Sequence, residues 1–203
     1  MPNQKFIFLL LGLFKKTKST PLKILFGVLA LLIIFFYGDF STSTQSANSI
    51  SSQQILEKIS DGDTLTFSLA KCRILYIDTP EKFESDKLYR NSVKCGIDIK
   101  RIIDAGELST KKANELLNIG KTYEIKTYEK DKYDRSLCQV KIDENLDFGE
   151  EMIKSGYAVL FKNGEGIKES NIKNRLISIQ NSAKKNGSGL WGEYSDVMEC
   201  TSY

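Results

Sequence analysis

The chain has 203 residues, of which 41% are hydrophobic and 27% charged, and these values suit one globular domain with an additional terminal segment. It contains no histidine, which excludes a histidine base, nucleophile or metal ligand. Five of the 29 basic and one of the 26 acidic side chains lie in residues 1–40, which leaves 24 basic and 25 acidic side chains in residues 41–203. Because this main part is not a polycation, it could bind nucleic acid only through a few placed arginines and lysines.

Residues 1–40 are predicted to be a basic leader followed by a hydrophobic membrane segment. The uncharged apolar run from Ile24 to Gly38 has 15 residues, fewer than the roughly 20 of a spanning helix and at the upper limit of a signal-peptide core. Lys23 could lengthen the run by reaching the interface, so we favour an uncleaved anchor over a cleaved signal peptide, with a buried soluble helix as a third alternative. The lysines before the run should stay in the cytoplasm, which places the following domain outside it, either anchored or secreted. Residues 41–53 read as a polar linker.

The rest of the chain alternates between strand and helix patterns. Five short strands are predicted at residues 55–59, 64–69, 72–77, 121–130 and 135–143. Three helices are predicted at residues 107–120, 148–158 and 168–187, each with a glycine at or near its end. Residues 82–105 read as a charged insertion without a clear pattern, and residues 193–203 as a C-terminal tail. This order predicts a small β-barrel of the α+β class.

The first hairpin raises a question about two aspartates. A turn at Ala70 and Lys71 would place Asp63, at the start of one strand, opposite Asp78, at the end of the next. Facing carboxylates repel each other, and a bound cation is the simplest compensation. Two carboxylates, a carbonyl near Thr79 and water form an all-oxygen ligand set, which suits Ca²⁺.

Two arginines and a glutamate complete a chemical hypothesis. Arg73 lies in the same hairpin, although strict alternation puts it on the strand face opposite Asp78, so a turn or the barrel twist must redirect one of them. Arg135 begins a later strand. With a cation, two guanidinium groups could neutralise a phosphodiester, while ionised Glu81 takes a proton from water.

Each motif taken alone has an ordinary explanation. "DGDT" is commonly a turn before a strand, "DTPE" a turn or helix start, and "DKYDR" a solvated loop. The spacing of an EF-hand loop is absent. The order of the motifs, together with the hairpin, favours the joint interpretation.

In that order, "DGDTL", "CRILYIDTPE", "DKYDR", "MIKSGYA" and "GLW" resemble the staphylococcal nuclease-like, or thermonuclease, family. The resemblance implies a five-stranded OB-type barrel with about three helices over residues 54–192, hydrolysing DNA or RNA with Ca²⁺. By motif position, Asp63, Asp78 and Thr79 resemble the calcium ligands. Arg73, Glu81 and Arg135 resemble the catalytic residues, with Glu81 as general base, and Asp61 resembles an acid near the metal. All six principal positions are intact, which argues against a decayed copy.

The chain departs from the family pattern in two places. Asp134 stands where the family usually has glycine, beside Arg135. The tyrosine pair of type members is missing, and Lys132, Tyr133 and Tyr157 are candidates to replace it in substrate binding.

The four residues Cys72, Cys95, Cys138 and Cys200 allow two disulfides, and their spacing is not that of a zinc site. A disulfide between Cys95 and Cys200 is one option, but the sequence does not determine the pairing.

We therefore expect a monomeric Ca²⁺-dependent nuclease outside the cytoplasm, acting on DNA or RNA and attached to the membrane through its N-terminal segment. One alternative is a non-catalytic OB-type module that binds single-stranded nucleic acid, which would need stacking aromatics and a basic groove. Another is a structural, membrane-anchored calcium-binding domain, which would have no use for both arginines and Glu81 together.

Overall fold

The structure is a computed structural model that describes residues 49–164 and 167–202, all within one compact unit. Its strands are β1 (Ile50–Ile59), β2 (Thr64–Phe67), β3 (Lys71–Ile74), β4 (Ile77–Asp78), β5 (Thr122–Lys130), β6 (Ser136–Lys141) and β7 (Val159–Leu160). Its helices are α3 (Asp86–Cys95), α4 (Ile99–Leu116), α5 (Phe148–Lys154), α6 (Ser170–Lys185), α7 (Leu190–Glu193) and α8 (Ser195–Thr201). A 3₁₀ segment, η1 (Phe161–Gly164), follows β7.

The predicted membrane segment in residues 1–40 lies outside the described residues. Within residues 49–164 and 167–202, no helix combines the length and apolarity needed to cross a bilayer. The end of the predicted linker is described, and it differs from the prediction because β1 already begins at Ile50.

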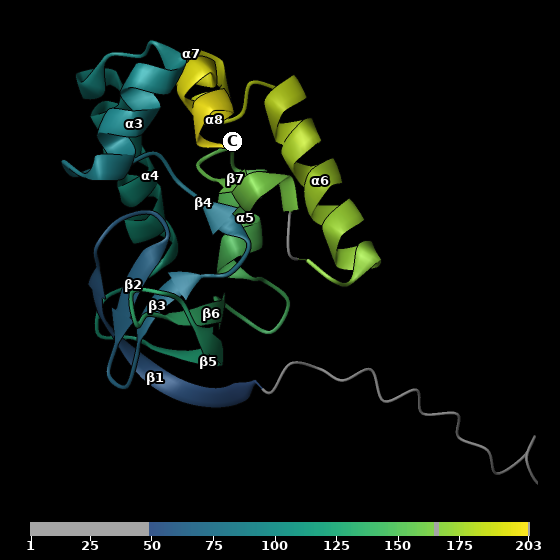
Figure 1. Ribbon diagram of the computed structural model, residues 1–203. Helices are drawn as coiled ribbons and strands as arrows, with labels where there is room; N and C mark the ends of the chain where they lie inside the picture. The colour runs from purple at the N-terminus through teal and green to yellow at the C-terminus, as the bar shows by residue number, and fades with distance from the viewer. Residues whose placement is uncertain (1–48, 165–166, 203) are drawn as a thin grey trace, which may run out of the picture. The chain divides into compact units, whose positions relative to one another are not determined.

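Five strands close into a barrel in the order β1-β2-β3-β6-β5, which confirms the predicted five-stranded α+β barrel (Figure 1). Neighbouring strands are antiparallel, except that β3 and β6 are parallel. The core inside includes Leu65, Phe67 and Ile125, which come from the apolar positions of β2 and β5. In Figure 1, helices α3, α6, α7 and α8 lie together beyond one end of the barrel.

The hairpin between β2 and β3 turns two residues earlier than predicted. Hydrogen bonds join Phe67 and Ala70 in both directions, so Ser68 and Leu69 form the loop. Thr64 consequently pairs with Arg73, and the carbonyl of Asp63 accepts from the N–H of Ile74 at 2.8 Å. The predicted register, with Asp63 opposite Asp78, was wrong.

The predicted strand over residues 72–77 is also interrupted. The chain turns at Leu75 and Tyr76, where Tyr76 has a φ of 68°, in the left-handed region. Beyond this turn β4 leaves the barrel and pairs antiparallel with β7, with Asp78 opposite Val159. Asp78 therefore belongs to a second, two-stranded sheet.

The region predicted as an unpatterned insertion is helical. Ser85 caps α3 by accepting a hydrogen bond from the N–H of Leu88 at 3.1 Å, and Gly96, with a φ of 66°, ends the helix. Asp98 caps α4, which therefore begins eight residues before the predicted helix start at Glu107. The caps were readable from the sequence, but the scattered apolar residues concealed α3 and the first eight residues of α4.

A second hydrophobic cluster joins these helices to the C-terminal segment. Its buried members include Leu88 of α3, Ile102 of α4, Trp191 of α7 and Met198 of α8. The residues predicted as a tail thus contain α8, which is packed against α3 and α4.

All four cysteines form disulfides. Cys72 of β3 is bonded to Cys138 of β6 across the parallel pair, and both side chains are fully buried. Cys95, at the end of α3, is bonded to Cys200 of α8, which was one of the options left open by the sequence.

Replacing both barrel cysteines in the variant Cys72→Ala/Cys138→Ala should lower the free energy of unfolding by about 2–5 kcal/mol. The physical reason is that the bond closes a long loop, with a sequence separation of 66 residues, between adjacent strands. Equilibrium unfolding in urea under non-reducing conditions measures the effect. A loss below about 1 kcal/mol would show that the bond adds little to the barrel.

Candidate active site

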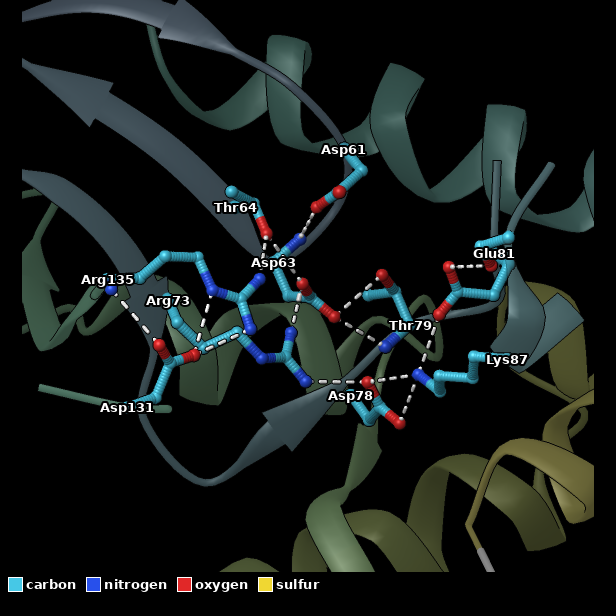
Figure 2. A network of polar contacts seen from close by, with 11 residues as sticks. Asp61, Asp63, Thr64, Arg73, Asp78, Thr79, Glu81, Lys87, Asp131 and Arg135 are labelled. Atoms are coloured by element: carbon cyan, nitrogen blue, oxygen red, sulfur yellow. Dashed lines mark hydrogen bonds and ion pairs between the residues drawn. The ribbon is translucent and has the colours of Figure 1, made fainter. Parts of the chain in front are cut away.

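A single guanidinium group brings Asp63 and Asp78 together (Figure 2). Arg73 pairs with Asp63 through Nη1 and with Asp78 through Nη2, the latter at 2.6 Å from Oδ1. The side chains of the two aspartates are only 8% and 5% exposed, and that of Arg73 is 13% exposed. Since buried carboxylates repel each other in a low dielectric, the arginine between them provides the charge that lets them lie close.

The turn at Leu75 and Tyr76 resolves the conflict between strand alternation and a shared site. Arg73 lies on β3 in the barrel, and the chain turns between it and Asp78. The two side chains therefore contact each other although they belong to different sheets. Asp78 was expected to converge with Asp63 along one hairpin, and it does so instead through this turn.

Thr79 forms two hydrogen bonds with the carboxylate of Asp63. Its N–H and its hydroxyl both donate to Oδ2 of Asp63, at 2.9 and 3.0 Å. Asp61 supports the same loop, because its Oδ1 accepts from the N–H of Asp63 at 3.1 Å. Burial raises the pKa of Asp61, although the positive charges of Arg73 and Arg135 oppose the shift.

Glu81 lies in the same network and has a donor on each oxygen. Its Oε1 is 2.7 Å from Nζ of Lys87, and its Oε2 accepts from the hydroxyl of Ser85 at 3.2 Å. Lys87 also contacts both carboxylate oxygens of Asp78, at 3.0 and 2.9 Å. Partial burial favours the neutral amine, but Asp78 and Glu81 outweigh it and raise the pKa of Lys87 above its ordinary value.

Helix α4 packs directly on the backbone that carries Glu81. A Cβ atom at Gly106 would lie 2.6 Å from the carbonyl oxygen of Glu81 and 2.8 Å from the nitrogen of Lys82. Only glycine permits this close approach, so the helix can support the backbone of Glu81 at this position.

Arg135 reaches the network at its opposite end. Its Nη1 donates to the hydroxyl of Thr64 at 3.3 Å, and Thr64 in turn contacts Oδ1 of Asp63 at 3.2 Å. Asp131 holds Arg135 by a two-pronged contact, with Oδ2 accepting from Nε at 2.8 Å and lying 2.7 Å from Nη2. Partial burial would raise the pKa of Asp131, but its hydrogen bonds from Arg135 dominate and the pKa lies below its ordinary value.

Asp134, which replaces the family glycine, contacts Lys130 rather than Arg135. Its φ is 63°, a conformation in which glycine is favoured, and its carboxylate is 2.7 Å from Nζ of Lys130. The acid that holds Arg135 is Asp131, four residues before it.

The three candidate substrate-binding residues have different environments. Tyr133 is 68% exposed, with Nζ of Lys132 at 4.9 Å and Cζ of Arg135 at 5.5 Å from its ring centre. Tyr157 packs against both hydrophobic clusters, and its carbonyl accepts from Ser109 at 2.8 Å. The structure therefore brings both Lys132 and Arg135 to the ring of Tyr133, and places Tyr157 in the packing between the clusters.

The donor set suits a hard cation. Asp63 and Asp78 bring four carboxylate oxygens to one place, with no thiol or imidazole beside them. In the structure each of these oxygens contacts a donor of Arg73, Lys87, Thr64 or Thr79, so a cation would have to replace some of these contacts. Within the described part of the chain, no group of three or more acidic, cysteine or histidine side chains could hold a metal by itself. A Ca²⁺ ion bound here would therefore draw two carboxylates from the chain and complete its shell with carbonyl and water oxygens.

Sequence reasoning missed Lys87, Ser85, Gly106 and Asp131. The cap signal of Ser85 followed by Asp86 could have revealed α3, and with it the placement of Lys87 in the first turn of a helix beside Glu81. The approach of Gly106 to Glu81 is a tertiary contact, and no local pattern announces it.

Known proteins are similar to this chain over its folded part. A family model described as Staphylococcal nuclease homologue matches residues 71–193. A protein named Probable endonuclease LCL3, from Komagataella phaffii, is 29% identical over 57% of this chain. The match covers only 56% of that protein's own length, so this chain spans little more than half of it. An uncharacterized protein of Methanocaldococcus jannaschii is 30% identical over 66% of this chain and 69% of its own length. A protein named Uncharacterized endonuclease, from Escherichia coli O157:H7, is 25% identical over 69% of this chain and 77% of its own length.

The variant Asp131→Asn should lose a pH-dependent part of the folding free energy. Because the pKa of Asp131 is lower in the folded chain, its contact with Arg135 stabilises the fold above the ordinary aspartate value of about 3.9 and is lost as the pH falls through the lower, folded value. At neutral pH we expect the wild type to be more stable by at most about 1 kcal/mol. Unfolding curves at several pH values test this, and a difference that stays constant into acid would contradict it.

Proposed function

Because the chain belongs to the staphylococcal nuclease homologue family, we propose that its folded unit is a Ca²⁺-dependent nuclease that hydrolyses phosphodiester bonds of DNA or RNA. The names of two relatives, a probable and an uncharacterized endonuclease, support hydrolysis of nucleic acid. The dependence on Ca²⁺ and the roles of individual residues are our own inference from the site.

The observation that carries this proposal is the shared arginine. Arg73 contacts two buried carboxylates, and Glu81 and Arg135 reach the same network through Lys87 and Thr64. Acid clusters serve many purposes, but two guanidinium groups beside a separate carboxylate suit an anionic substrate that must be attacked by water.

In the proposed mechanism, Asp63 and Asp78 would hold Ca²⁺, with the carbonyl of Thr79 as a further ligand. Bound there, the ion would polarise a phosphoryl oxygen and lower the charge on the phosphate. Glu81 accepts a proton from a water molecule as the water oxygen bonds to phosphorus. Arg73 contacts both aspartates in the structure, so binding of the ion to Asp63 and Asp78 would free its guanidinium group. Arg73 and Arg135 then bind the phosphate oxygens and stabilise the added negative charge while the ester P–O bond breaks and the leaving oxygen takes a proton from solvent. Asp61 supports the loop of Asp63 from behind.

The second candidate, a non-catalytic module for single-stranded nucleic acid, is favoured by one observation. Tyr133 is largely exposed and lies beside two cations, Lys132 and Arg135, which is the combination that stacks bases and attracts phosphates. In the nuclease proposal the same residues bind the substrate next to the site.

For the whole protein we propose a location outside the cytoplasm, with residues 1–40 as membrane anchor or signal peptide and residues 41–53 as linker. Both disulfides support this proposal, because such bonds form and persist in oxidising compartments. Fractionation of cells separates the two cases, since an anchored protein should sediment with membranes at full length.

Replacing the proposed base in Glu81→Gln should lower kcat on single-stranded DNA with Ca²⁺ by about 10²–10⁴-fold, because the amide cannot accept the proton. Ca²⁺ binding, measured by calorimetry, should persist, because Asp63 and Asp78 are unchanged. Cleavage by the wild type should stop when a chelator is added.

The matched control is Glu84→Gln, which makes the same change at an exposed position three residues away and should leave the rate unaltered. Tight DNA binding without cleavage by the wild type would favour the binding module. Cleavage at an unchanged rate in the presence of the chelator would show that the mechanism does not require a metal ion.

A further inference from the structure

Helix α3 adds a cation to the site that the family motifs do not include. Lys87 is the only one of the network's three cations that contacts both Asp78, a proposed metal ligand, and Glu81, the proposed base (Figure 2). Its Nζ is 2.9 Å from Oδ2 of Asp78 and 2.7 Å from Oε1 of Glu81. The carboxylates are 5% and 23% exposed, so this contact differs from an ion pair on the open surface.

Helix α3, which carries Lys87, is held in place by contacts at both of its ends. At its start, Ser85 caps the helix and also donates to Glu81 at 3.2 Å. One turn later Leu88 is fully buried in the second hydrophobic cluster. At its end, Cys95 is bonded to Cys200 of α8. A residue on such an element has a well-defined position, whereas one on a free loop would not.

We propose that Lys87 is a positioning residue of this nuclease, delivered by the disulfide-anchored helix α3, and that it fixes the carboxylate of Glu81 toward the water to be activated. The inference rests on the proposed function, since it presupposes Glu81 as the base. With Lys87 on one oxygen and Ser85 on the other, the carboxylate of Glu81 is held in a single orientation.

The same lysine has an opposite effect on the metal. Its ammonium group lies against Asp78, so a Ca²⁺ ion that binds this carboxylate must share it with a neighbouring positive charge. Removing the ammonium group should therefore not weaken Ca²⁺ binding, while it releases Glu81. A lysine that merely stabilised the fold would change both properties in the same direction.

The test compares Lys87→Met with Lys87→Arg in the full-length protein. For Lys87→Met we expect kcat on single-stranded DNA to fall about 10- to 100-fold, because small misplacements of a reacting group cost this much. The KM should stay within about twofold, and the Ca²⁺ dissociation constant from calorimetry should be equal or lower. Lys87→Arg keeps a cation and should recover part of kcat.

The control is Lys94→Met, which removes an exposed lysine seven residues along the same helix and should leave kcat unchanged. The variant Cys95→Ser/Cys200→Ser releases the end of α3 without touching Lys87. It should lower kcat in the same direction, with unchanged Ca²⁺ binding, and it serves as the second test if Lys87→Met does not fold.

Two results would overturn the inference while leaving the proposed function intact. One is a Lys87→Met enzyme with kcat within about twofold of the wild type, and the other is a loss of kcat accompanied by weaker Ca²⁺ binding. A wild type that shows no Ca²⁺-dependent cleavage would instead reject the proposed function, and this inference with it.

Discussion

The contact of Arg73 with Asp63 and Asp78 is the interaction on which the rest of the site depends. It joins the barrel, through β3, to the small sheet of β4 and β7, through Asp78. Removing one partner from a buried, hydrogen-bonded charge set leaves the others uncompensated, at a cost of about 3–5 kcal/mol. The site is therefore also part of what holds the two sheets in register.

From that contact the charges alternate along the network. Arg135 and Thr64 lie at one end, Lys87 and Glu81 at the other, and the two aspartates and Arg73 between them. The barrel disulfide reinforces the arrangement, because Cys72 and Cys138 adjoin Arg73 and Leu137, which are paired across β3 and β6. Of the two proposed phosphate-binding arginines, Arg73 thus lies on β3 and Arg135 directly before β6, and these two strands are covalently linked.

Much of the fold and part of the site could be predicted from the sequence. Alternation and β-branched or aromatic composition identified the strands of the barrel, and the expected hairpin and the family resemblance suggested that Asp63 and Asp78 meet. The predicted pairing of Asp63 with Asp78 across one hairpin was wrong. The tight turn at Ser68 and Leu69 shifts the register, and a second turn at Leu75 and Tyr76 directs Asp78 into another sheet. Local patterns detect strands, but they do not determine how a chain continues past a left-handed residue such as Tyr76.

The barrel's closure limits how this protein meets other molecules. Each of the five strands β1, β2, β3, β6 and β5 pairs with two neighbours, although in β1 the first half pairs with β5 and the second half with β2. Closure therefore leaves little edge for strand addition by a peptide or a second copy, the route that open sheets provide. Recognition at the barrel therefore depends on side chains and loops at its rim.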